Sequence, residues 1–201
     1  MDRVAVFLDY ENVHRTGHQQ FAGVGQPLYE TAVDPLLIAQ RLVEKRHPGG
    51  ALQSVWVYRG RPVPEYQPKS ASANDVQAAA WSEDRRVHVI RRDLKYDWND
   101  DGTFIAREKG IDVALAVGLT EGALDKAFDV AIVFSTDTDL MPALELVFRR
   151  RLVQLEIAAW SGRKALWFPE FLRQNPPRRL PFCHFLDQND FYSCRDYSAV
   201  G

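Results

Sequence analysis

The sequence predicts an α/β fold in which a mostly parallel central sheet lies between two layers of helices. Three observations predict it. Five short apolar runs have the composition of buried strands, stretches with helical spacing separate them, and acidic or polar residues directly follow some of the runs. Strands that alternate with helices form parallel sheets, and ligands collect outside the carboxyl ends of their strands.

The first strand is expected at Val4–Leu8, where five apolar residues follow one another. The polar, glycine-containing stretch from Glu11 to Ala32 is expected to be a long connection. A helix then begins near Asp34-Pro35, because aspartate caps helices and proline suits the first helical position. The apolar face of this helix comes from Leu36, Leu37, Ala39, Leu42 and Val43, and "HPGG" ends it.

The middle of the chain predicts two further strands, a helix and an inserted ribbon. The strands are expected at Ser54–Tyr58 and Val87–Ile90, with a helix at Ala71–Trp81 capped near Ser72 or Asn74. Two short extended runs, Leu94–Trp98 and Thr103–Arg107, flank the turn sequence "NDDG". An Asp-Gly pair between extended runs is a hairpin signal, so a β-ribbon is expected near residues 94–107.

The C-terminal half predicts a buried helix at Ile111–Leu119, which is apolar nearly all round. The fourth and fifth strands are expected at Val130–Phe134 and Val153–Ala158, with a helix at Thr138–Arg151 that carries Pro142 in its first turn. A short helix is expected from Ser161 to about Phe171, before "NPPRRLP" breaks regular structure. We therefore expect a domain over residues 1–160 and an aromatic-rich extension, residues 161–201, packed on it.

Composition narrows the class of protein. The chain has 201 residues, 46% of them hydrophobic, and a net charge of -2. Because no apolar stretch reaches the roughly 18 residues that span a bilayer, and no signal peptide precedes the first strand, a cytoplasmic location without a membrane partner is expected. Cys183 and Cys194 are expected to be free thiols. Binding to nucleic acid would have to depend on a local basic patch.

Carboxylates from distant parts of the chain are expected at one edge of the sheet. Asp9 ends the first strand, Asp137 and Asp139 follow the fourth, and Asp112 lies in the first turn of the preceding helix, with Asn12 nearby. Two like charges about 4 Å apart cost roughly 4 kcal/mol at an effective dielectric of about 20. Such a cluster therefore takes up protons or holds a cation, and all-oxygen ligands favour Mg²⁺ or Mn²⁺, as in phosphodiester hydrolysis.

Each of these residues also has a structural interpretation. Asp139 would cap the helix that begins at Leu140, and Asp137 would be a turn residue. Asp112 would stabilise the helix dipole, and Asn12 would cap a helix or form an Asx-turn. A purely structural role is least expected for Asp9, because it interrupts a buried strand. The joint placement of these residues carries more weight than any one of them.

Three blocks of the sequence resemble NYN domains, a branch of the PIN-like metal-dependent ribonucleases. These are "VFLDYENV", "KGIDVALAVGL" and "VAIVFSTDTDLMPALE", in the family's order, and the resemblance covers about Val4 to Ala159. It implies a PIN-like three-layer α/β/α sandwich and an endoribonuclease that uses Mg²⁺ or Mn²⁺. The long stretch from Glu11 to Ala32 and the tail after Ser161 depart from the family's simplest members.

The resemblance also implies roles for individual residues. Asp9, Asp112 and Asp137 match the family's metal ligands, direct or through water. Asp139 would support the cluster or a second metal, and Asn12 would orient a ligand or the attacking water. Ser135 of the third block is expected among the substrate contacts.

Basic residues near the carboxyl ends of the strands are candidates for binding single-stranded or structured RNA. The main candidates are Arg15, Arg59, Arg61 and Lys109, and Arg91, Arg92 and Lys95 follow the third strand. Trp98 and Tyr10 are candidates for stacking on unpaired bases, with packing as the alternative role. Ordinary solvated charge is the alternative role for each cation.

Two other function classes stay open. One is a catalytically silent RNA-binding or scaffolding module that keeps the fold. The other is a phosphohydrolase that forms an aspartyl-phosphate, because Glu11 follows Asp9 at the spacing which that chemistry uses. A homo-oligomer is also possible for any of these classes.

Overall fold

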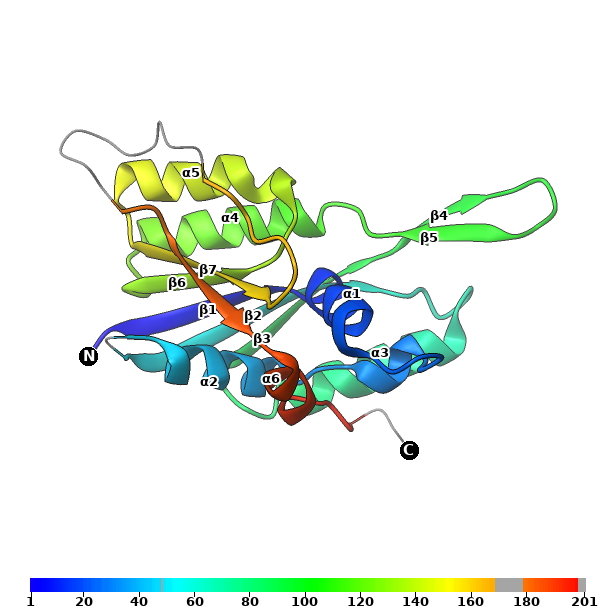
Figure 1. The fold of residues 1–201 in the computed structure, drawn as a ribbon. Coiled ribbons are helices and arrows are strands. Elements are labelled where there is room, and N and C mark those ends of the chain that lie inside the picture. Colours follow the sequence, from blue (N-terminus) through cyan, green and yellow to red (C-terminus); the bar gives the residue numbers. More distant parts are fainter. Residues whose placement is uncertain (48, 169–178, 199–201) are drawn as a thin grey trace.

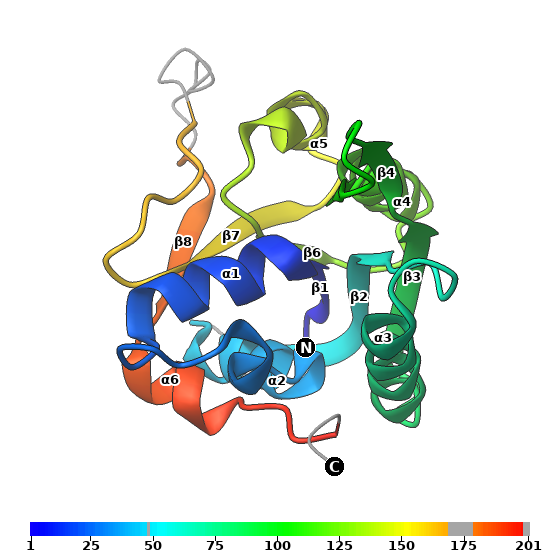
Figure 2. The ribbon, with the colours of Figure 1, turned by 90° about the vertical axis from the view of Figure 1, so that its right-hand side faces the viewer.

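Six parallel strands form one sheet between two layers of helices, which is one strand more than the five that the sequence predicts (Figures 1 and 2). The computed structural model describes residues 1–47, 49–168 and 179–198. The strand order is β3-β2-β1-β6-β7-β8. The strands are β1 (Arg3–Asp9), β2 (Ala51–Arg61), β3 (Val87–Asp93), β6 (Val130–Phe134), β7 (Gln154–Trp160) and β8 (Phe182–Leu186).

The helices divide between the two faces of the sheet (Figure 1). The first face is covered by α4 (Ile111–Leu124) and α5 (Met141–Arg150), and the second by α1 (Tyr10–Phe21), α2 (Pro35–Lys45), α3 (Pro68–Trp81) and α6 (Gln188–Ser193). Two 3₁₀ helices, η1 (Leu28–Thr31) and η2 (Thr138–Leu140), lie in connections. The predicted α/β/α sandwich is therefore confirmed.

Strand β1 contributes side chains to both hydrophobic cores. Val4, Val6 and Leu8 point into the core beneath α1 and α2, whereas Ala5 and Phe7 point into the core beneath α4 and α5. Successive side chains of a strand point to opposite faces, so a strand buried on both faces is apolar throughout. β1 is therefore fixed from both sides, and the position of Asp9 at its end is fixed with it.

The stretch after β1 is a helix rather than the long connection that the sequence predicts. Its buried positions Tyr10, Val13, His14 and Gly17 recur at helical spacing. Two of the four are a histidine and a glycine, which is why an apolar pattern does not reveal the helix. The polar ring of His14 can be buried because its Nε2 forms hydrogen bonds with Leu28 O (2.9 Å) and Thr31 Oγ1 (3.3 Å).

The C-terminal segment differs from prediction. Residues 161–168 form a turn and irregular structure instead of the start of a helix, and residues 169–171 lie outside the described part of the chain. β8 then pairs in parallel with β7. This strand is hard to detect from the sequence because its polar and apolar positions are reversed. The polar His184 is buried, with its Nε2 in a hydrogen bond with Glu156 at 2.7 Å, whereas two phenylalanines of the strand are exposed.

Several local predictions agree with the structure. Asp34 caps α2 by accepting hydrogen bonds from the backbone of Leu36 and Leu37, and β4 (Lys95–Trp98) pairs antiparallel with β5 (Phe104–Arg107) as the predicted ribbon. Cys183 and Cys194 are free. α3 begins earlier than predicted, at Pro68.

Helix α4 is less buried than its composition predicts. Val113, Val117 and Leu124 are each more than half exposed, because only one side of the helix lies on the sheet. The helices of the described ranges include none with the length and hydropathy needed to cross a membrane.

Gly17 allows a close contact between α1 and two aromatic rings. A Cβ at this position would lie 2.8 Å from Phe191 and 2.9 Å from Nε1 of Trp160, which donates to Val13 O. Alanine favours a helix by up to about 1 kcal/mol over glycine, but overpacking costs about 1–3 kcal/mol. We expect Gly17→Ala to lower the free energy of unfolding, measured by urea denaturation.

The control for this substitution is Gly23→Ala, where the nearest atom to a new Cβ lies 4.0 Å away. This variant should unfold like the parent protein. Equal stability of Gly17→Ala and the parent would show that the two rings move freely, contrary to the tight packing around Gly17.

Candidate metal centre

The central strands β1 and β6 end side by side, and this brings distant polar residues together. Leu8 pairs with Phe134, so Asp9 and Ser135 follow neighbouring positions at the carboxyl edge of the sheet. This edge is where parallel α/β sheets bind ligands. The predicted convergence of the first and fourth strands is therefore seen in the register.

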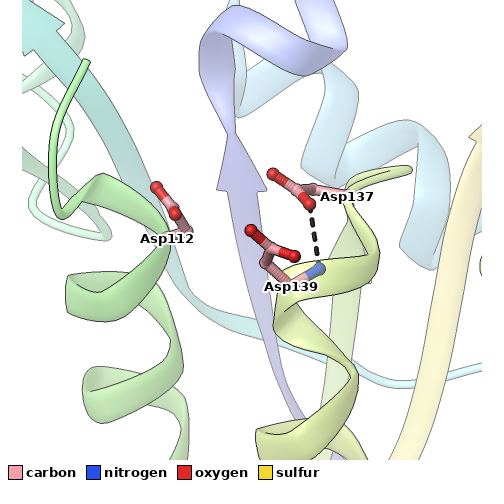
Figure 3. Close-up of side chains that lie close together, drawn as sticks. All are labelled: Asp112, Asp137 and Asp139. Atoms are coloured by element: carbon pink, nitrogen blue, oxygen red, sulfur yellow. Dashed lines mark hydrogen bonds between the residues drawn. The ribbon is translucent and has the colours of Figure 1, made fainter.

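Three carboxylates meet at this edge (Figure 3). One oxygen of each of Asp112, Asp137 and Asp139 lies within 4.8 Å of the others. Asp112 comes from the first turn of α4, and the other two come from the loop after β6 and from η2. Asp112 and Asp137 are half-buried, whereas Asp139 is exposed.

Asp9 lies deeper than these three carboxylates. It does not belong to the group whose oxygens lie within 4.8 Å of one another among the described residues. Its side chain is only 9% exposed, and its Oδ2 accepts a hydrogen bond from Ser135 Oγ at 2.8 Å. Burial raises the pKa of Asp9 to about 6, against the hydrogen bonds from Ser135 and the backbone of Asn12. The charges of Asp137 and Asp112 raise the pKa further, so Asp9 lies within the field of the cluster.

Hydrogen bonds fix the loop that carries Asp137. Ser135 Oγ accepts from the backbone N–H of Asp137 (3.0 Å) while it donates to Asp9. On the other side, Asn12 Oδ1 accepts from both the backbone N–H and the hydroxyl of Thr136, each at 3.1 Å. The first turn of α1 thus positions the loop after β6.

The residue that caps the helical turn after β6 differs from the one that the sequence analysis considered. Asp137, not Asp139, caps η2, because its Oδ1 accepts from the backbone N–H of Asp139 at 2.9 Å (Figure 3). A carboxylate has two oxygens, and each can accept more than one hydrogen bond or bind a cation. Capping therefore leaves Asp137 able to contribute to the cluster.

Sequence reasoning missed Glu108, which adds to the negative charge of the site. Burial raises the pKa of Glu108 to about 7, the charges of Glu11 and Asp9 raise it too, and the hydrogen bond from the backbone of Gly60 opposes the shift. A Cβ at Gly60 would lie 2.8 Å from Glu108 Oε1. An isolated glycine in a strand marks such a close approach, so Gly60 was the available signal.

The predicted substrate contacts lie in different environments. Ser135 is fully buried, and Arg59, 6% exposed, lies over the rings of Tyr10 (4.6 Å) and Trp81 (5.0 Å). Burial therefore argues against direct contact of either residue with a large substrate.

The other three predicted contacts are more accessible. Arg61 forms a bidentate pair with Asp75, with both contacts at 2.9 Å. Arg15 is exposed and bonds to Glu11 at 3.2 Å. Lys109 is exposed three residues before Asp112.

The donor set of the cluster fits a hard divalent cation. It consists of carboxylate oxygens, which suit Mg²⁺ and Mn²⁺ better than zinc. Burial, with smaller contributions from neighbouring carboxylates, raises the pKa values of Asp9 and Glu108, so the charged forms of both groups are costly at this edge. A bound dication would lower that cost.

Comparison with known proteins settles the family. The family model of the NYN domain matches residues 3–167, which is well over half of the chain. The chain belongs to the NYN family. This family lies within the PIN-like nuclease superfamily, so its members have a nuclease-type fold and act on nucleic acids.

Solved and curated proteins add little to this assignment. The crystal structure of a protein of unknown function from Vibrio parahaemolyticus RIMD 2210633 is similar, with 17% sequence identity and a TM-score of 0.47. The match covers 78% of this chain and 80% of that one. No curated protein matches.

Within the NYN domain, Asp9 should lower stability when no cation is bound. Its pKa is near 6 in the folded protein and near 3.8 in the unfolded chain, so deprotonation favours unfolding as the pH rises through this interval. We expect Asp9→Asn to raise the free energy of unfolding in EDTA by roughly 1–3 kcal/mol above pH 6. The gain should vanish near pH 4, as measured by urea denaturation.

The effect of Mg²⁺ on the melting temperature tests directly whether the cluster binds a cation. A cation that binds only the folded state stabilises it by mass action, so the melting temperature of the parent protein should rise with Mg²⁺ concentration. Asp112→Asn should reduce this rise. If EDTA and Mg²⁺ gave identical melting curves in the parent, the cluster would not be a cation site.

Proposed function

We propose that this NYN protein is an endoribonuclease that hydrolyses RNA with Mg²⁺ or Mn²⁺ as cofactor. The observation that carries the proposal is the convergence of Asp112, Asp137 and Asp139 within 4.8 Å. It occurs at the carboxyl edge of a parallel sheet, in a chain of a nuclease-type family.

The residues divide into those that hold the cation and those that fix them. Asp112, Asp137 and Asp139 would hold it, and Asp9 lies behind them as a further carboxylate. When bound, the ion supplies positive charge for the phosphate oxygens and makes water a stronger acid. Ser135 and Asn12 keep the loop of Asp137 in place through the hydrogen bonds described above.

The polyanion would be held by exposed cations at the rim. Lys109 and Arg15 have the exposure that phosphate contacts need. Arg61 is one-third exposed and already paired with Asp75, so its contribution to binding should be smaller. We assign Arg59 and Ser135 to positioning, because both are buried.

The two rival classes make different demands on the site. A silent RNA-binding module has no need for the acidic positions, all of which are filled. An aspartyl-phosphate enzyme needs an accessible nucleophile, whereas Asp9 is buried and hydrogen-bonded to Ser135. The geometry therefore favours hydrolysis that does not pass through a phosphorylated Asp9.

The first activity test is substitution within the cluster. Asp112→Asn and Asp137→Asn remove charge from the cation site at nearly constant shape, so RNA cleavage should fall at least about 100-fold. Asp125→Asn, at the far end of α4, is the matched control and should cleave normally. Normal cleavage by both cluster variants, with far-UV circular dichroism confirming their folds, would refute the mechanism.

The second test uses a circular RNA, which has no ends for an exonuclease to attack. We expect cleavage in Mg²⁺ and in Mn²⁺, none in EDTA, and recovery when the metal is restored. Attack by water should leave 5′-phosphate and 3′-hydroxyl ends, detectable by ligation and phosphatase treatment. Binding of RNA without cleavage in any metal would favour the silent module instead.

A further inference from the structure

The β4–β5 ribbon projects away from the sheet on the side where α4 begins (Figure 1). An isolated two-stranded ribbon is marginally stable, so this one needs support. Tyr96 supplies it: its hydroxyl accepts from the backbone of Val63 and donates to Gln67, each at 2.9 Å. The ribbon is therefore attached at its base to the connection between β2 and α3.

One face of the ribbon carries aromatic rings. Trp98 lies directly opposite Phe104 in the antiparallel register, with ring centroids 5.1 Å apart. Tyr66 packs against Trp98 and Tyr96, with centroid distances of 5.3 and 4.7 Å. Trp98 is nevertheless 54% exposed, so this supported ring still offers surface to a ligand.

The opposite face carries cations at the base of the ribbon. Lys95 lies directly opposite Arg107, and both are exposed. Like charges directly opposite each other destabilise a strand pair. Asp97 relieves part of this cost by bonding to Arg107 at 3.1 Å.

These cations continue toward the acidic cluster. The chain runs from Arg107 through Lys109 to Asp112. The cation Arg92 also lies close to the start of α4. Its Nε would be 3.6 Å from a Cβ placed on Gly110, the residue that precedes this helix. The acidic residues Asp100 and Asp101 lie at the tip, whereas the base carries the four cations Arg92, Lys95, Arg107 and Lys109 beside the three acids Asp93, Asp97 and Glu108. Cations therefore outnumber acids only on the part of the ribbon nearest the site.

We propose that the β4–β5 ribbon is an arm that binds single-stranded RNA next to the cleavage site, with phosphates on Lys95 and Arg107 and a base stacked on Trp98. This inference rests on the proposed function, because it takes RNA as the substrate class. The complementary charge of the ribbon base selects a polyanion. The exposed indole selects one with unstacked bases.

The two faces decide between a single strand and a duplex. Cations and aromatic rings lie on opposite faces of a narrow ribbon, so a ligand that contacts both must bend around its edge. A single strand does this readily. A duplex is stiff on this length scale, with a persistence length of about 50 nm for DNA, and its bases are already stacked.

The test measures binding of a fluorescein-labelled, unstructured 12-nucleotide RNA in EDTA by fluorescence anisotropy. Trp98→Ala should weaken binding by about 5- to 160-fold, the range expected when one base no longer stacks on an aromatic ring. Trp167→Ala is the matched control, because Trp167 is 72% exposed elsewhere on the surface. It should bind like the parent protein.

Salt dependence tests the phosphate contacts separately. The double substitution Lys95→Ala with Arg107→Ala should make the slope of log K against log salt less negative by about 1.4, because each phosphate of a single strand that a cation neutralises contributes about −0.7 to the slope. Unchanged melting temperatures would show that the variants keep their fold. A purely structural role of these side chains would leave the slope unaltered.

The outcomes separate this inference from the proposed function. If the ribbon variants bind and cleave like the parent, the arm is refuted and the nuclease stands. If Trp98→Ala loses affinity for the single strand in a protein that cleaves no RNA, the arm is supported and the nuclease is refuted. If a matched duplex binds as tightly and loses as much affinity, the assignment to single strands is wrong.

Discussion

The hydrogen bond from Ser135 to Asp9 joins the two central strands at the point where both end, and the geometry of the site depends on it. Asp9 is held in place by β1, which is buried on both faces. Ser135 Oγ, which donates to Asp9, also accepts from the backbone N–H of Asp137 and so ties the loop to this strand. The loop after β6 is therefore held by the most rigid part of the sheet. This explains how a carboxylate in a loop can occupy a defined place.

That arrangement has an electrostatic cost. Asp9 is buried, the groups that donate hydrogen bonds to it from Ser135 and Asn12 are uncharged, and its pKa rises toward neutrality. Glu108, in the connection between β5 and α4, shows the same behaviour: burial and the charges of Glu11 and Asp9 raise its pKa. Asp75 shows the opposite behaviour, because its hydrogen bonds with Arg61 lower its pKa. A bound cation would stabilise the charged forms of the buried carboxylates at this edge in the same way.

Sequence reasoning identified the features that depend on local pattern. Strands such as Val130–Phe134 are continuous apolar runs, and the register of a parallel sheet then places the residues that follow them at one edge. The same reasoning placed Asp112 in the first turn of α4. These predictions needed only the chain direction and the alternation of strands with helices.

The missed features depend on tertiary contacts. Helix α1 buries His14 and Gly17, and β8 buries His184, so polar or small residues occupy positions where a pattern search expects apolar ones. The burial of Arg59 is equally invisible, because the rings that cover it come from α1 and α3. Whether a cation is available to a substrate is decided by neighbours far away in the sequence.

The distribution of cations around the site follows from this. Arg59 and Arg61 extend from the end of β2, next to β1, yet Arg59 is buried against two aromatic rings and Arg61 is paired with Asp75. The positive charge at the end of β2 thus helps to hold α3 against the sheet. A polyanion that approaches the acidic edge meets exposed cations at Arg92, near the end of β3, and beyond the sheet, where solvent-exposed side chains can turn toward phosphates. The ribbon between β3 and α4 provides such a place, because its base carries exposed Lys95 and Arg107 while its connection to α4 leads directly to the cluster.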